Sequence, residues 1–215
     1  MRGVVLSSIK YSDNSNVVTI FLEHDGLQSF ILHRGKGRSR LHGAIFNACC
    51  LVDVEYTCHA DKAIQYAREV KLFRPLNGIF SSPHKAIIAM FIAEVMKHSL
   101  KGEKDNPQLF KFIQESILWL DMVGEPAESM VGAVPELVEG VESKEETNLD
   151  GFPAMFLTTL LSYIGYDLRY SSNSHILTDT ADTQTTLRHI IDIYRQHIPA
   201  FPELKSLSMM EVINS

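Results

Sequence analysis

Residues 16–33 read NVVTIFLEHDGLQSFILH and carry the clearest structural signal in the sequence. The run 17–22 is β-branched and aromatic, which is typical of a strand, and His24-Asp25-Gly26 supplies turn residues. Residues 27–32 then resume the strand pattern. We therefore predict a β-hairpin over residues 16–33.

Three further strands are predicted around this hairpin. Residues 3–11 form a strand before it, joined by the turn Asp13-Asn14-Ser15-Asn16. Residues 49–58 alternate between apolar and polar side chains, as a half-buried strand does, and residues 64–73 also fit a strand. Five short strands without a long helix favour a small β-barrel or sandwich over residues 1–80.

The pattern becomes helical after residue 80. Ser82-Pro83 and Asn106-Pro107 each combine an N-cap residue with a proline suited to the first helical turn, and apolar residues then recur at helical spacing. A third helix is predicted over 157–164 and a fourth over 187–194.

These patterns predict an α+β, multidomain chain. The first domain is a five-stranded β-barrel over residues 1–80, and the second is an all-α helical bundle over residues 81–215. The length of 215 residues fits one or two domains, and the content of 45% hydrophobic residues excludes general disorder.

Charge is distributed unevenly between the two predicted domains. The formal net charge is −6, but residues 1–80 carry ten Lys/Arg and seven Asp/Glu, whereas residues 81–215 carry ten and nineteen. A basic half is a hint of nucleic-acid contact. Eight of the acidic residues lie within 125–150, which we predict to be a mobile acidic loop with little to bury.

The three cysteines argue for a reducing compartment. Cys49, Cys50 and Cys58 are odd in number and include an adjacent pair, so a disulfide framework is not expected. Their spacing does not suit a zinc site, and we predict that they are small buried hydrophobes. The longest uncharged stretch, 151–166, is shorter than the ~20 residues of a membrane span, so we predict a cytoplasmic protein without a membrane partner.

Catalytic motifs are not found in the sequence. Gly35-Lys36-Gly37 superficially resembles a phosphate-binding loop, but it lacks the upstream glycine and the Ser/Thr that follows the lysine. No nucleophile elbow or zinc-binding helix is present. We therefore predict a protein that is not an enzyme and uses no cofactor or metal.

The most informative segment is 33–42, where four cations alternate with small residues. Glycines let a backbone approach a polyanion closely, and Arg/Lys side chains neutralise phosphates. A small barrel with cationic loops is a common binder of single strands, whereas the alternative interpretation is a solvated basic loop. The candidate DNA-binding residues are Arg34, Lys36, Arg38 and Arg40, with additional charge from Lys10, Arg2, Lys71 and Arg74.

Several segments along the chain share one resemblance. They are Arg2-Gly3-Val4-Val5-Leu6 and 28–35 in the strands, Ala93-Glu94-Val95, Leu118-Trp119-Leu120-Asp121 and Tyr163-Ile164-Gly165-Tyr166 in the helices, and the tail 194–207. Together, in this order, they resemble the RecO family of bacterial recombination-repair proteins, and the tail resembles the Bacteroidetes members in particular.

The resemblance implies an N-terminal OB-fold, a helical C-terminal domain and a non-enzymatic role. RecO proteins bind single- and double-stranded DNA, anneal complementary strands, and help load recombinase on strands coated by single-strand-binding protein (SSB), together with RecR. The resemblance therefore also implies association with the nucleoid. Some relatives carry a four-cysteine zinc module, but no cysteine follows Cys58 here, so no zinc is expected.

In the family, the helical domain takes up the acidic C-terminal tail of SSB. We expect a hydrophobic slot between helices with at least one cation at its mouth to receive the carboxylates of the tail. The candidate cations are Lys85, Lys97, Lys101, Arg188 and Arg195.

Two other functions compete with this interpretation. The first is an interaction adaptor whose barrel binds a protein and no DNA. A salt titration distinguishes it, because phosphate contacts make single-strand binding fall steeply with salt, whereas an adaptor would not bind the strand at all. A nucleotide-processing enzyme is the other alternative, and metal-dependent nuclease or phosphatase activity would reveal it.

Overall fold

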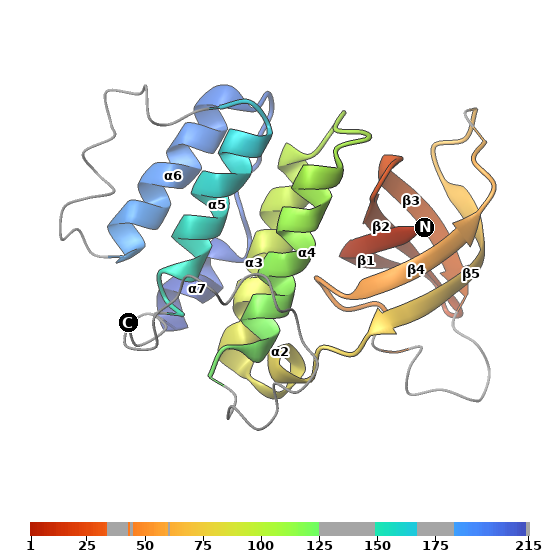
Figure 1. Ribbon diagram of the computed structural model, residues 1–215, viewed down its shortest axis with the longest axis horizontal. Coiled ribbons are helices and arrows are strands. Elements are labelled where there is room, and N and C mark those ends of the chain that lie inside the picture. Colours follow the sequence, from red (N-terminus) through yellow and green to blue (C-terminus); the bar gives the residue numbers. More distant parts are fainter. Residues whose placement is uncertain (34–42, 44, 60, 125–148, 167–182, 214–215) are drawn as a thin grey trace.

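The computed structural model describes residues 1–33, 43, 45–59, 61–124, 149–166 and 183–213. Five strands come first and helices follow (Figure 1). The strands are β1 (Arg2–Ser12), β2 (Ser15–Leu22), β3 (Gly26–His33), β4 (Leu51–Tyr56) and β5 (Gln65–Arg74). The helices are α2 (Asn77–Ser81), α3 (Pro83–Ser99), α4 (Pro107–Met122), α5 (Phe152–Tyr163), α6 (Thr183–His197) and α7 (Leu207–Ile213).

The strands close into a barrel in the order β1-β2-β3-β5-β4. All neighbouring pairs are antiparallel except β3 and β5, which pair in parallel at Phe30 with Gln65 and at Ile31 with Tyr66. The predicted five-stranded, OB-like barrel is confirmed. Its interior is filled by the inward side chains of all five strands, among them Val18, Phe30 and Val52.

The predicted hairpin over 16–33 is also confirmed as β2 and β3. Gly26 ends the turn with a φ of +68°, a conformation that glycine adopts without strain. A Cβ atom at this position would lie 2.0 Å from the carbonyl oxygen of Glu103. The glycine therefore lets the hairpin turn approach the connection between α3 and α4.

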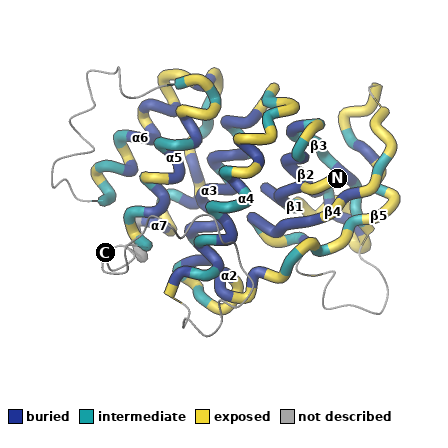
Figure 2. Tube along the Cα trace, viewed as in Figure 1, coloured by how far each residue is buried: buried dark blue, intermediate teal, exposed yellow. Residues whose placement is uncertain are grey.

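The barrel and the helices share one hydrophobic core. The outward side chains of Val4, Leu6 and Phe21 are buried in the same cluster as α3, α4 and α5, and the Phe21 ring lies 6.2 Å from the ring of Phe110 in α4. Figures 1 and 2 show α3 and α4 beside the barrel, with buried chain on both sides of the boundary and α5 and α6 beyond. The position of α3 and α4 is thus set by one face of β1 and β2.

The predicted helix starts are confirmed by their caps. Ser82 Oγ accepts a hydrogen bond from the backbone N–H of Lys85 (3.4 Å), and Asn106 Oδ1 accepts one from Leu109 (3.1 Å). At the other end of the predicted third helix, α5 gives way to Gly165, whose φ is +93°. The short helices α2 and α7 were not predicted, because five or seven residues do not establish a helical period.

Two expectations about the cysteines need correction. Cys49 has a φ of 63°, which is incompatible with a strand, so β4 begins only at Leu51. Cys49 and Cys50 are buried, as predicted, and point into different clusters, Cys49 toward the helices and Cys50 into the barrel. Cys58 is exposed and not buried, because β4 ends at Tyr56.

Two predictions remain untested, the domain boundary and the acidic loop. The strands end at Arg74 and α2 begins at Asn77, but a division into domains at residue 80 stays a prediction, since the two halves share a core. The acidic stretch 125–150 lies almost wholly outside the described residues. Within the described part of the chain, no helix is both long and apolar enough to cross a membrane.

The shared core predicts that a cavity in the barrel face destabilises the helices. Phe21→Ala should lower the free energy of unfolding by about 3–5 kcal/mol, as Phe-to-Ala changes in cores do. The fluorescence of Trp119, the only tryptophan, reports on α4 and should show the same shift in denaturant midpoint as circular dichroism. Phe73→Ala, on the exposed barrel surface, is the control. An unchanged Trp119 midpoint in Phe21→Ala would contradict a shared core.

Candidate nucleic-acid and peptide surfaces

The basic segment leaves the barrel at one rim. Arg34, Lys36, Arg38 and Arg40 lie outside the described residues, but the strand that precedes them is described. β3 ends at His33, which pairs with Ser15 of β2, and Ser15 pairs with Ser12 of β1. The cations therefore follow directly from the rim formed by the end of β1, the start of β2 and the end of β3.

The other four candidate cations fall into two separate places. Lys10 lies near that rim and makes an exposed ion pair with Asp13 (3.1 Å). Arg2 lies at the opposite end of β1, about 27 Å away along an extended strand, with its guanidinium 4.3 Å from the centre of the Phe73 ring. Arg74 is the last residue of β5 and pairs with the start of β4, on the same side of the barrel as Arg2. The structure does not bring these four cations together.

The outer face of β4 and β5 carries both signs of charge. Lys71 Nζ lies 2.7 Å from Glu69, and the hydrogen bond to this carboxylate raises the pKa of Lys71. Arg68 lies 3.9 Å from Glu55. Lys71 therefore faces acidic neighbours, and this face is a weaker candidate for a polyanion than the rim that carries the basic segment.

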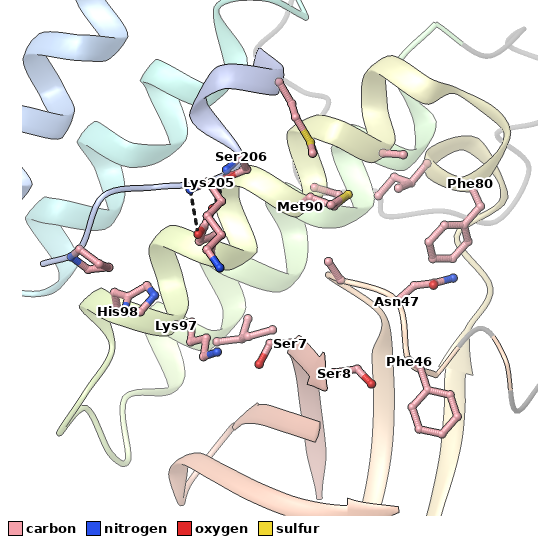
Figure 3. A pocket seen from close by; sticks show the side chains of 18 of the residues that line it. Ser7, Ser8, Phe46, Asn47, Phe80, Met90, Lys97, His98, Lys205 and Ser206 are labelled. Atoms are coloured by element: carbon pink, nitrogen blue, oxygen red, sulfur yellow. Dashed lines mark hydrogen bonds between the residues drawn. The ribbon is translucent and has the colours of Figure 1, made fainter. Parts of the chain in front are cut away.

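A groove of about 910 Å³ separates the barrel from the C-terminal segment (Figure 3). Its walls come from three parts of the chain: β1 with the turn at 46–48, α2 with α3, and residues 202–209. Its lining is largely apolar and includes Leu6, Ile79, Ala86, Ala89, Met90 and Met209. Met90 and Met209 are both substantially exposed, so the groove is open to solvent.

Glu94 of α3 holds the C-terminal wall in place. Its carboxylate accepts hydrogen bonds from the backbone N–H groups of Lys205 (3.1 Å) and Ser206 (2.9 Å) and from the hydroxyl of Ser206. Partial burial favours a higher pKa for Glu94, but the hydrogen bonds from Ser206 and Lys205 outweigh it and the pKa is lowered. The carboxylate is thus charged at neutral pH and already has partners.

Cations gather at the end of the groove formed by the last turn of α3. Lys97 and His98 line this end, beside Ser7 in Figure 3, and Lys205 lines the C-terminal wall. Partial burial, followed by the charges of Lys101 and Lys97, lowers the pKa of His98, so its ring is neutral at neutral pH and the positive charge at this end comes from the lysines. The C-terminus of a helix favours such positive charge. The groove therefore combines apolar walls with an end that suits a carboxylate.

The structure separates the five cations predicted to bind a tail peptide. Lys97 lines the groove, and Lys101 follows α3 at the same end. Lys85 is only 6% exposed and donates a hydrogen bond to the backbone carbonyl of Asp121 (2.9 Å), so it stabilises the joint between α3 and α4. Arg188 and Arg195 lie on α6, where Arg195 pairs with Asp192 (3.0 Å), and neither lines the groove.

The sequence did not indicate Lys205, Met209 or the 46–48 turn as parts of one surface. No spacing rule connects them, because they come from distant segments brought together by the packing of β1 on α3. Among the described residues, no group of three or more His, Cys, Asp or Glu side chains is arranged to hold a metal ion. The absence of a zinc module stays a prediction.

Comparison with known proteins shows similarity to RecO proteins over nearly the whole chain. Residues 1–76 match the family model described as "Recombination protein O N terminal". Proteins named DNA repair protein RecO are similar over nearly the whole chain. That of Bacteroides fragilis is 26% identical over 97% of this chain and 96% of its own, and that of Phocaeicola vulgatus 26% over 99% and 98%. That of Flavobacterium psychrophilum is 24% identical over 100% and 98%. The predicted resemblance is confirmed, and it supports a role in DNA repair.

The contacts of Glu94 predict how the C-terminal wall of the groove responds when the carboxylate is removed. Glu94→Gln should speed amide hydrogen exchange at Lys205 and Ser206, because an amide accepts these bonds more weakly than a carboxylate. Since the folded pKa of Glu94 is lowered, its contribution to stability is present above the ordinary pKa of glutamate, about 4.3, and is lost as the pH falls through the folded pKa. The difference in thermal stability from wild type should therefore shrink in acid.

Glu115→Gln is the matched control, because Glu115 lies on α4 and its ion pair is with Lys111 of the same helix (3.6 Å). Equal exchange at residues 205 and 206 in wild type and Glu94→Gln would contradict this role of Glu94.

Proposed function

We propose that this chain is a member of the RecO family and a recombination-repair mediator that binds single- and double-stranded DNA. In this role it anneals complementary strands and helps load recombinase, together with RecR, on DNA coated with SSB. The observation that carries the proposal is an OB-like barrel from whose rim a segment with four cations departs.

DNA binding by this segment follows from its composition. Arg34, Lys36, Arg38 and Arg40 alternate with Gly35, Gly37 and Ser39, so short side chains leave the backbone free to approach phosphates. Each cation that meets a phosphate releases a counterion, which makes binding strong at low salt and independent of base sequence. The rim is a favourable origin for the segment, because the neighbouring acidic side chain Asp13 is already paired with Lys10.

Annealing of complementary strands needs little more than the neutralisation of their phosphates. Two complementary strands repel each other through their phosphates, and neutralising that charge while both strands are held close lets base pairing proceed. No covalent bond forms or breaks in the process. We therefore expect annealing to proceed in the presence of a chelator and without nucleotide.

The groove beside α3 is the proposed site for the acidic tail of SSB. The apolar lining would take up the tail's terminal apolar side chain, and Lys97 with Lys205 would face its carboxylates. Glu94 opposes an acidic peptide less than an unpaired glutamate would, because three donors already satisfy its carboxylate. The proposed peptide site therefore lies between the barrel and the helices, and not between helices alone as the sequence led us to expect.

An adaptor without DNA binding is the second candidate. The net charge of −6 and the mixed charge of the β4–β5 face favour it. An adaptor would bind the tail peptide but no oligonucleotide at any salt concentration.

Removal of cations from the basic segment tests DNA binding. The double substitution Arg34→Ala with Lys36→Ala should weaken binding to all sequences alike and reduce the slope of log affinity against log salt by about 1 for each lost phosphate contact. Fluorescence anisotropy with a labelled oligonucleotide at several salt concentrations measures both quantities. Lys111→Ala, which removes an ion-paired cation from α4, should change neither. Unchanged affinity and slope in the double variant would contradict DNA binding by the segment and favour the alternative interpretation, a solvated basic loop.

Charge reversal at Lys97 tests the peptide site. Lys97→Glu should weaken binding of a synthetic acidic peptide that ends in an apolar residue by roughly tenfold or more, since a hydrogen bond to a charged group contributes about 1.5–3 kcal/mol. Calorimetry on the full chain measures the affinity, with Lys111→Glu as the control. Equal affinity in the two variants would exclude the groove as the peptide site.

A further inference from the structure

Two methionines lie exposed in the groove beside α3. Met90 of α3 is 47% exposed and Met209 of α7 is 48% exposed, and both line the groove. In Figure 3, Met90 lies on α3 between Phe80 and the C-terminal wall. The two methionines come from different walls, so each wall contributes thioether surface to the space that a ligand would fill.

Met90 belongs to the apolar part of the groove and not to its cationic end. Met90, Glu94 and Lys97 share one face of α3, because helical side chains three or four residues apart lie above one another. At 1.5 Å of rise per residue, Lys97 lies about 10 Å further along the helix axis than Met90. An apolar side chain of a ligand would therefore meet Met90 while its carboxylates meet Lys97.

Exposure distinguishes these two methionines from their neighbours in the sequence. Met96 of α3 and Met210 of α7 are buried in the core. Each helix thus turns one thioether inward and another toward the groove. An oxidant dissolved in water reaches Met90 and Met209 in the folded chain, whereas the packing of the core shields Met96 and Met210.

Oxidation would change the chemistry of this surface. When hydrogen peroxide oxidises a thioether, an S–O bond forms, the O–O bond breaks, and the second oxygen leaves as water; the sulfur loses two electrons and the peroxide gains them. The sulfoxide is polar and accepts hydrogen bonds, whereas the thioether is apolar. The nearby hydroxyl of Ser206 already donates to Glu94. An apolar ligand packed on the sulfoxide would bury an acceptor without a donor, which costs binding free energy.

We propose that Met90 and Met209 form an oxidation site through which hydrogen peroxide lowers the affinity of the groove for its ligand. The inference rests on the proposed peptide site and adds a form of regulation to it. Lys97 and Lys205 keep their charge, so oxidation weakens the contact with the apolar end of the peptide and not the contact with its carboxylates. Methionine sulfoxide reductase reverses the change, because a dithiol becomes a disulfide and the oxygen leaves as water.

The experiment measures peptide binding by the full chain before and after limited treatment with hydrogen peroxide. All proteins carry Cys58→Ser, because Cys58 is an exposed thiol outside the groove that peroxide also oxidises. Tandem mass spectrometry should find sulfoxide at Met90 and Met209 before it appears at Met96 and Met210. Calorimetry with a synthetic acidic peptide that ends in an apolar residue should then show a roughly tenfold loss of affinity, the order expected when one apolar side chain loses its buried contact. Methionine sulfoxide reductase with dithiothreitol should restore the affinity.

The double substitution Met90→Leu with Met209→Leu removes both sulfur atoms and keeps an apolar lining of similar volume. This variant should bind the peptide and keep its affinity after treatment with peroxide. Met155→Leu is the matched control, because Met155 is 54% exposed on α5 and does not line the groove. The control should lose affinity as the parent protein does.

Unchanged affinity after oxidation of both Met90 and Met209 would overturn the oxidation site and leave the proposed peptide site intact. An equal loss of affinity in the double variant would also overturn it, because another residue would then cause the effect. So would oxidation of Met155 without oxidation of the two groove methionines, or removal of both sulfoxides by the reductase without recovery of affinity. Absence of peptide binding before treatment would overturn the peptide site and the oxidation site together.

Discussion

The packing of Phe21 and Val4 against α3 and α4 is the contact on which the rest of the structure depends. A strand that faces solvent on its outer side normally carries polar residues there, but β1 and β2 carry apolar ones along much of their length. The helices bury one end of that face and stop at the row of Ser7, Thr19 and Ser29. The same contact thus creates the shared core and leaves the other end open toward the rim where the basic segment begins.

The groove is a second consequence of this packing. One face of α3 lies against β1, and another face meets the C-terminal segment. Glu94 of α3 holds this segment by accepting hydrogen bonds from its backbone. The two proposed binding surfaces are therefore centred on different elements, the rim at the strand ends and α3, although β1 contributes to both. DNA would meet the open strand ends and the peptide would meet α3. Binding of both ligands by one molecule would suit the proposed role on DNA coated with SSB.

Local chemistry in the sequence was enough to predict the strands, the hairpin turn and the helix caps. Gly26, Ser82 and Asn106 each act through neighbours within a few residues, so their roles are readable without a fold. The parallel pairing of β3 with β5, the burial of Lys85 and the groove depend on contacts between segments far apart in sequence. Spacing rules hold no information about such contacts. The candidate cations were accordingly identified by type, but their grouping was not.

The most direct test of separate binding surfaces is hydrogen exchange measured by mass spectrometry on the full chain, once with a thymidine oligomer and once with the acidic peptide. The account predicts that the oligomer slows exchange at the end of β1, the end of β3 and the start of β5, and leaves α3 and residues 202–209 unchanged. The peptide should do the reverse. Protection of α3 and residues 202–209 by the oligomer, without protection of the strand ends, would contradict the account.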